Sequence, residues 1–182
     1  MTELDGRYGP CMPADRLVRE WELFNQPKSK CELDRASGGQ LHAYMSSVQG
    51  NPYAETLANT TGILWLIDYD GKVFFAQEET YLESNLSLAF IFPRKHLLLP
   101  PGLIKLGHPS LLPPGLAHTK LARCAGDITY DPDLNADLPW IIRFASGRYA
   151  AHRSHLTLGM LQTVAERFED CGVYVAPIHD TL

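Results

Sequence analysis

The sequence has few cysteines, no excess of basic residues and no long hydrophobic run, and each absence argues against a class of protein. The four cysteines among 182 residues are widely spaced and form no Cys-x-x-Cys pair, whereas zinc sites and redox dithiols usually show close ligand spacing. The formal net charge is −5, whereas a nucleic-acid-binding protein usually has a concentration of positive charge. No apolar run approaches the roughly 20 residues that cross a membrane.

A secretory signal peptide is also missing, because the first residues include Glu3 and Asp5 in place of an apolar core. These absences predict a cytoplasmic protein with reduced thiols, or one exported without a signal peptide into a target cell. We expect no metal cofactor, no nucleic-acid partner and no membrane span.

What the sequence does contain is typical of a globular protein, with 45% hydrophobic and 20% charged residues. Its length suits one domain over residues 1–182. Within that domain we expect a helical N-terminal part at residues 1–61 and a β-rich core with a C-terminal helix at residues 62–182.

Helical spacing of apolar residues predicts three helices. After an irregular arm at residues 1–12, the first helix is expected at residues 13–25, with Pro13 in its first turn. The second is expected at residues 41–48 and should end at Gly50. The third and longest is expected to begin at Ser154 as its N-cap and to stop before Gly172.

Strand patterns fill the remainder. Residues 62–67 and 72–76 are β-prone and flank an Asp70-Gly71 turn, which predicts a hairpin. Further strands are expected at residues 88–92, 96–99, 119–130, 140–145 and 173–176. The proline-rich segment 100–114 can be neither continuous helix nor central strand, so we expect it to be a lid, a rim or a binding loop.

Together these elements predict an α+β fold with two N-terminal helices and one C-terminal helix. The sheet is expected to be mostly antiparallel or a partly closed barrel, because the hairpin and short connections leave no room for crossover helices.

Three polar clusters lie beside these strands, and they are the predicted site. They are Gly107-His108-Pro109-Ser110, Ala125-Gly126-Asp127 and Ser146-Gly147-Arg148-Tyr149. Strands that end in one neighbourhood bring such side chains together on a rigid floor.

The chemistry of these residue types assigns expected roles. His108 can exchange a proton near neutral pH, Asp127 can orient it or stabilise a cation, and Tyr149 can stack or donate a hydrogen bond. These three are the predicted catalytic residues. The predicted substrate-binding residues are Ser110, Ser146, Gly147 and Arg148, of which Arg148 suits a phosphate or carboxylate.

The order and spacing of the clusters resemble the C-terminal domain of the plant IQ-motif calmodulin-binding (IQM) family and similar bacterial toxin or effector domains. In that pattern a His-Ser-Ser stretch precedes Ala-Gly-Glu and then Ser-Gly-His-Tyr, over residues 62–172 here. This chain departs from the pattern at Pro109, Asp127 and Arg148. It also has no Ile-Gln-x-x-x-Arg helix, so calmodulin is not an expected partner.

Two classes of function remain open. An imidazole, a carboxylate and a phenol from separate strands are similar to the site with which ADP-ribosyl-transferring toxins hold NAD. The chain is then a small effector-like transferase that acts on a small-molecule or protein substrate and uses NAD. The alternative is a non-catalytic binding or regulatory module, such as an immunity-type partner protein, in which the clusters only form turns.

Other chemistries have less support. A metal site from His108, His118, Cys124 and Asp127 would need an unusual convergence. A Ser/His/acid hydrolase would be expected to carry Gly-x-Ser-x-Gly, which is missing. The enzyme hypothesis requires His108, Asp127 and Tyr149 to line one solvent-reachable pocket.

Overall fold

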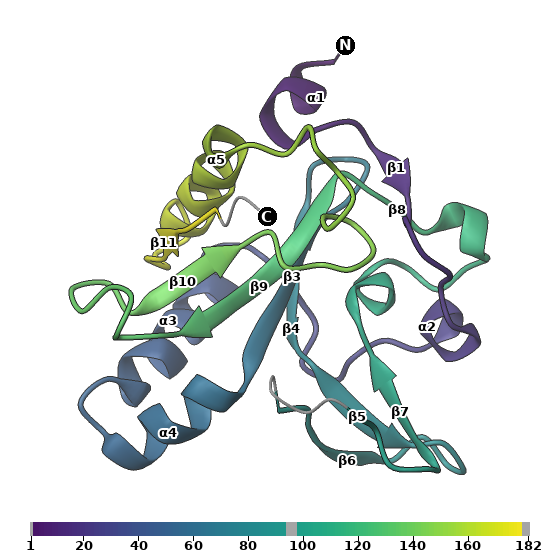
Figure 1. Cartoon of the computed structure of the whole chain (residues 1–182), viewed down its shortest axis with the longest axis horizontal. Coiled ribbons are helices and arrows are strands. Elements are labelled where there is room, and N and C mark those ends of the chain that lie inside the picture. The colour runs from purple at the N-terminus through teal and green to yellow at the C-terminus, as the bar shows by residue number, and fades with distance from the viewer. Residues whose placement is uncertain (1, 94–97, 180–182) are drawn as a thin grey trace.

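The structure, a computed structural model, describes residues 2–93 and 98–179 and is built around a six-stranded sheet (Figure 1). In spatial order its strands are β11 (Ala176–Pro177), β10 (Trp140–Arg143), β9 (Cys124–Tyr130), β3 (Gly62–Ile67), β4 (Val73–Gln77) and β2 (Cys31–Glu32). Only β10 and β11 pair in parallel, because α5 (Leu158–Glu169) lies between them in the chain.

Strand β3 lies inside this sheet and is apolar at nearly every position, so both of its faces are buried. Ile63, Trp65 and Ile67 pack into the larger hydrophobic cluster, which also contains residues of α3 (Arg35–Val48), α4 (Pro52–Thr60) and α5. Leu64 and Leu66 point to the opposite face and pack with Leu111, Leu112 and Tyr149. That second face, away from the long helices, carries the polar clusters.

A smaller sheet extends from the first and is visible at the lower right of Figure 1. Its order is β6 (Leu88–Ile91), β5 (Glu79–Leu82) and β7 (Leu103–Leu106). Only Glu78 separates β4 from β5, so the chain passes directly from one sheet to the other. The remaining elements are α1 (Glu3–Tyr8), β1 (Met12–Pro13), α2 (Glu20–Phe24), β8 (Leu121–Ala122) and two 3₁₀ turns, η1 (His108–Leu111) and η2 (Ala117–Thr119).

Two buried arginines hold the N-terminal segment against the sheet. Arg123 donates to the Asp5 carboxylate at 2.8 Å and to the carbonyl oxygen of Gly9 at 3.0 Å. Arg153 donates to the carbonyl oxygen of Pro13 at 2.8 Å and forms an ion pair with Asp15 at 3.3 Å. Strand β1 also pairs with β8. Residues 5–15 are therefore fixed by contacts with distant parts of the chain.

The expected α+β class is confirmed, and the sheets are open, so the barrel alternative does not apply. The hairpin with its Asp70-Gly71 turn is confirmed as β3 and β4, and Gly71 has a positive φ of 80°.

The helices differ more from expectation. There are four before β3, because the expected irregular arm contains α1, capped by Thr2, and Asn51 with Pro52 starts α4. Pro13 lies in β1, and the helix expected from there is only α2. Helix α5 begins after Thr157 rather than Ser154, since the Thr157 hydroxyl accepts from the amide of Met160.

The other strand predictions also needed adjustment. The segment expected to cross residues 119–130 is divided into β8 and β9 by the break at Arg123. The strand expected at residues 96–99 begins among residues 94–97, which lie outside the described residues. Segment 100–114 contains an edge strand, β7, and the buried turn η1, so much of the expected lid is packed into the molecule.

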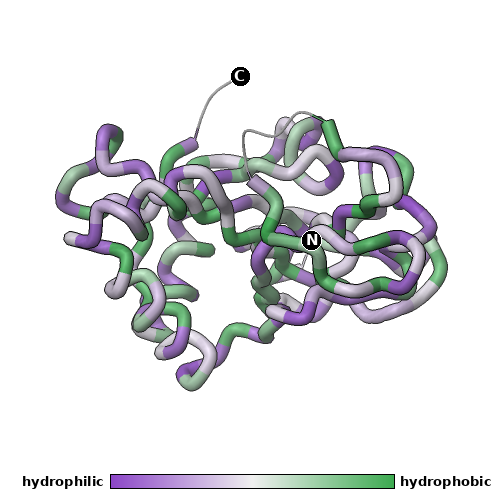
Figure 2. Tube along the Cα trace, turned by 90° about the horizontal axis from the view of Figure 1, so that it is seen from below, coloured by the Kyte–Doolittle hydropathy of each residue, from purple (hydrophilic) through white to green (hydrophobic). Residues whose placement is uncertain are grey.

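Hydrophobic and hydrophilic residues alternate over short distances along the trace (Figure 2). Over residues 2–93 and 98–179, no helix combines the length and the apolar character needed to cross a bilayer.

Candidate functional site

The candidate site lies on the face of the central sheet opposite the long helices. Asp127 of β9 is the cross-strand partner of Leu64 in β3, so both side chains point to this face. The turn η1 packs on the same face and brings His108 to β9, where its Nε2 lies 2.8 Å from the carbonyl oxygen of Gly126. Residues far apart in the sequence thus meet at one place.

His108 and Asp127 line a common pocket with a volume of about 600 Å³, which we call the His108 pocket. Its other charged lining residues are the cations Arg16, Arg19, Lys105 and Arg148 and the carboxylates of Glu22 and Glu78. Gly147 also lines it. The volume is in the range of small-molecule sites.

Glu22 links three parts of the pocket wall. Its side chain is only 2% exposed and its Oε1 lies 2.6 Å from Nη1 of Arg148. The same oxygen accepts from the amide of Gly107 at 3.2 Å, and Oε2 accepts from the amide of Arg19 at 3.0 Å. Such a buried carboxylate is held in place by its charged and hydrogen-bonding partners.

His108 is a neutral imidazole at physiological pH. Burial lowers its pKa to about 4, since the protonated ring would lose its hydration, and the positive charges of Arg148 and Lys105 act in the same direction. A carbonyl oxygen can only accept a hydrogen bond, so the neutral ring carries its proton on Nε2 and donates it to Gly126. This tautomer leaves Nδ1 as a hydrogen-bond or proton acceptor.

Some cations of the pocket are paired with carboxylates and others are not. Lys105 and Glu78 form an ion pair at 3.1 Å, and burial raises the pKa of the Glu78 carboxyl. Arg16 and Arg19 are exposed at the pocket rim, and neither forms an ion pair with a carboxylate within the described chain. Arg16 instead contacts the ring of His152 at 3.1 Å. These rim guanidiniums are available to an anionic ligand.

Tyr149 lies outside the pocket. It is fully buried in the second hydrophobic cluster, and its hydroxyl donates to the carbonyl oxygen of Lys120 at 3.0 Å. Burial raises the pKa of its phenol well above the ordinary value. The structure therefore brings together two of the three predicted catalytic side chains, and the third supports the wall behind them.

Two of the four predicted substrate-binding residues also line the pocket, and two do not. Arg148 and Gly147 line the pocket, whereas the Ser146 hydroxyl accepts from the amides of Arg148 and Tyr149 and shapes the turn. Ser110 is fully buried in η1, and its hydroxyl has no hydrogen-bond partner within residues 2–93 and 98–179. Because η1 is a 3₁₀ turn and not extended chain, Ser110 does not accompany His108 into the pocket.

Sequence reasoning did not identify Glu22, Glu78, Lys105, Arg16 or Arg19. Each lies in a segment where a charged residue looks like ordinary solvent-facing polarity, and only tertiary packing brings these segments together. Of the other candidates, Cys124 is buried and its thiol pKa is raised, so it is not an activated nucleophile. Among the described residues, no three His, Cys, Asp or Glu side chains are placed to hold a metal ion.

The fold and site describe an α+β protein with a charged pocket centred on a neutral histidine. No family model matches the chain, and no curated protein or solved structure matches it either.

Proposed function

We propose that the His108 pocket is the active site of an enzyme that acts on a small anionic substrate, with NAD as the first candidate. One observation carries the proposal: His108 and Asp127, from different elements, line a pocket whose rim presents Arg16 and Arg19. A neutral proton acceptor, a carboxylate and guanidiniums in one pocket suit a substrate that bears phosphate.

The chemistry proposed for NAD is transfer of its ADP-ribosyl group. The bond between the ribose C1 and the nicotinamide nitrogen breaks, and its electron pair leaves with nicotinamide. The oxygen of water or of an acceptor hydroxyl forms the new bond to C1 and gives its proton to Nδ1 of His108. Asp127 stabilises the positive charge that develops on the sugar. The expectation that Tyr149 also lines the pocket is not met, so this scheme uses His108 and Asp127 alone and gives Tyr149 a structural part.

The test is release of nicotinamide from NAD by the purified protein. Replacement of His108 by Gln keeps a donor for the Gly126 carbonyl and removes the proton acceptor Nδ1, so turnover should fall about 100-fold or more. His118→Gln is the matched control, since His118 is exposed on η2. Circular dichroism of each variant establishes that the fold is retained.

Tyr149→Phe separates this scheme from one that uses all three predicted catalytic residues. It removes only the hydrogen bond to Lys120, so the folded variant should keep its turnover. A folded Tyr149→Phe protein without turnover would contradict the assignment, as would equal turnover in wild type and His108→Gln. Absence of any NAD turnover would favour the second candidate, a non-catalytic binding module. The observation behind that candidate is that Arg148 is already paired with Glu22.

A further inference from the structure

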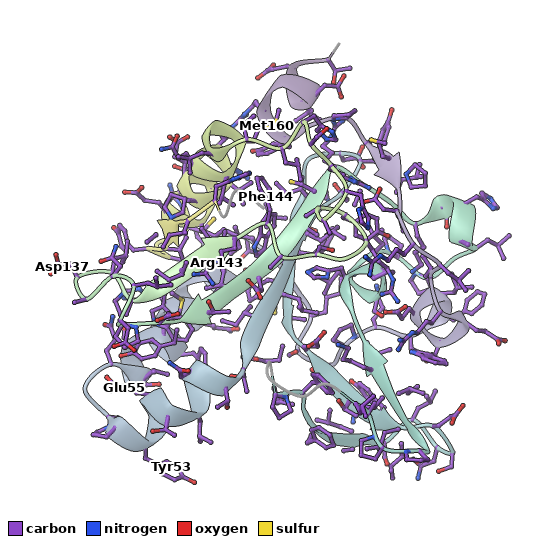
Figure 3. All side chains as sticks on the ribbon, in the orientation of Figure 1. Tyr53, Glu55, Asp137, Arg143, Phe144 and Met160 are labelled. Carbon is purple, nitrogen blue, oxygen red and sulfur yellow. The ribbon has the colours of Figure 1, made fainter. Side chains whose placement is uncertain are left out.

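A second pocket of about 610 Å³ adjoins the His108 pocket, and we call it the His152 pocket. Its lining includes Phe144, Leu156 and the imidazoles of His152 and His179. Phe144, labelled in Figure 3, follows β10, and its ring lies against the rings of Trp65 and His179. The two pockets share Ala145 and Gly147 in their lining. One short loop therefore separates two cavities of nearly equal size.

The two pockets differ in chemistry. Among the described residues, four cations and three carboxylates line the His108 pocket, whereas Arg153 is the only residue of fixed charge that lines the His152 pocket. Arg153 is buried and already donates to Asp15 and to the carbonyl oxygens of Ala122 and Arg123. What remains for a ligand is an apolar wall with imidazoles at its edge, which suits a flat ring with hydrogen-bonding atoms.

The loop between the pockets is a low barrier. Ala145 and Gly147 are small and exposed, and the Ser146 side chain is turned inward to hold the backbone. Arg16 connects the two sides, because it lines the His108 pocket and its guanidinium contacts Nε2 of His152 in the other. The large side chain on this path is Arg16, whose guanidinium can bind a phosphate in place of its contact with His152.

We propose that the two pockets form one extended site for a nucleotide-type ligand. The heteroaromatic ring lies in the His152 pocket against Phe144, and the phosphate lies in the His108 pocket near Arg16 and Arg19. This assignment deepens the proposed function and rests on it for the nature of the anionic group. It makes the His152 pocket the part of the site that selects the ring.

The test is calorimetric titration of the full chain with AMP, adenosine and inorganic pyrophosphate. AMP should bind at least tenfold more tightly than adenosine or pyrophosphate alone, because it occupies both pockets at once. His152→Ala removes the imidazole and also the contact that it makes with Arg16, so it should weaken AMP and adenosine at least threefold and change pyrophosphate binding less. Arg19→Gln should weaken AMP and pyrophosphate but not adenosine. His118→Ala is the control.

Gly147→Leu tests whether the ligand passes over the loop between the two pockets. A Cβ atom at Gly147 meets only Arg16, at 3.9 Å, so the backbone accepts the change while the larger side chain obstructs the loop. AMP affinity should fall by more than that of pyrophosphate, because only AMP has to cross the loop, while the added side chain approaches Arg16 for both ligands. Equal affinities of AMP and pyrophosphate in wild type, no AMP binding, or an unchanged AMP affinity in both His152→Ala and Gly147→Leu would overturn the proposal.

The binding experiments can fail or succeed independently of the proposed enzyme activity. Turnover of NAD without competition by AMP would leave the activity standing and remove the extended site. Binding of AMP across both pockets without NAD turnover would support the extended site and contradict the proposed enzyme activity.

Discussion

The low pKa of His108 makes the stability of the protein depend on pH in a predictable window. In the unfolded chain a histidine has a pKa of about 6.5, whereas burial lowers that of His108 in the fold to about 4. Above pH 6.5 both states are neutral, and stability is at its maximum with respect to this group. Between these two values the unfolded chain binds the proton and the folded chain does not, so stability falls as the pH is lowered.

The size of the effect follows from the two pKa values. Each pKa unit corresponds to about 1.4 kcal/mol, so a shift from 6.5 to about 4 predicts a loss of about 3 kcal/mol on acidification. The loss is complete below about pH 4. His155 contributes in the same direction, because burial also lowers its pKa. The experiment therefore has to separate the contribution of His108 from that of His155.

Urea denaturation of wild type and His108→Gln at half-unit steps from pH 7.5 to 4 provides that comparison. Gln cannot titrate, so the difference in unfolding free energy between the two proteins should change by about 3 kcal/mol across the series. His118→Gln should follow the wild-type curve. Parallel curves for wild type and His108→Gln would refute the argument that burial keeps the ring neutral, and so would an NMR titration of His108 with a midpoint near 6.5.

Three substitutions test other parts of the structure, each by urea denaturation at pH 7. Glu22→Gln removes the charge that pairs with Arg148 inside the pocket wall and should cost about 2–4 kcal/mol; a change below about 0.5 kcal/mol would contradict the role of this pair. Gly126→Ala places a Cβ atom on the carbonyl oxygen of Arg143 and should cost about 3 kcal/mol or prevent folding, so wild-type stability would contradict that packing. Lys120→Met removes both buried hydrogen bonds of the ammonium group and should cost about 1–3 kcal/mol; increased stability would show that the cost of burying the charge outweighs its bonds.

Local patterns predicted those parts of the fold that local physics decides. The β3–β4 hairpin needed only two β-prone runs and a glycine with positive φ, and α5 needed only an apolar face. The helix expected from Pro13 failed because pairing of β1 with β8 overrides the local preference. Helix α1 was missed because its capping by Thr2 stabilises a segment with little apolar periodicity.

The site was predictable in position but not in composition. Polar residues beside strands identified His108 and Asp127, which the β3–β9 register and η1 bring to one pocket. Tyr149 was expected beside them, but only tertiary packing decides whether an aromatic ring faces a cavity or the core. Glu22 has no signal in the sequence, because its burial depends on Arg148 and Gly107, both distant in the chain.

The attachment of residues 5–15 has a consequence for biosynthesis. The partners of this segment, Arg123 and Arg153, emerge from the ribosome long after it does. Asp5 and Asp15 can form these ion pairs only after Arg123 and Arg153 have been translated. Residues 5–15 are therefore translated before the partners that fix them, and they reach their native position only after those partners are made.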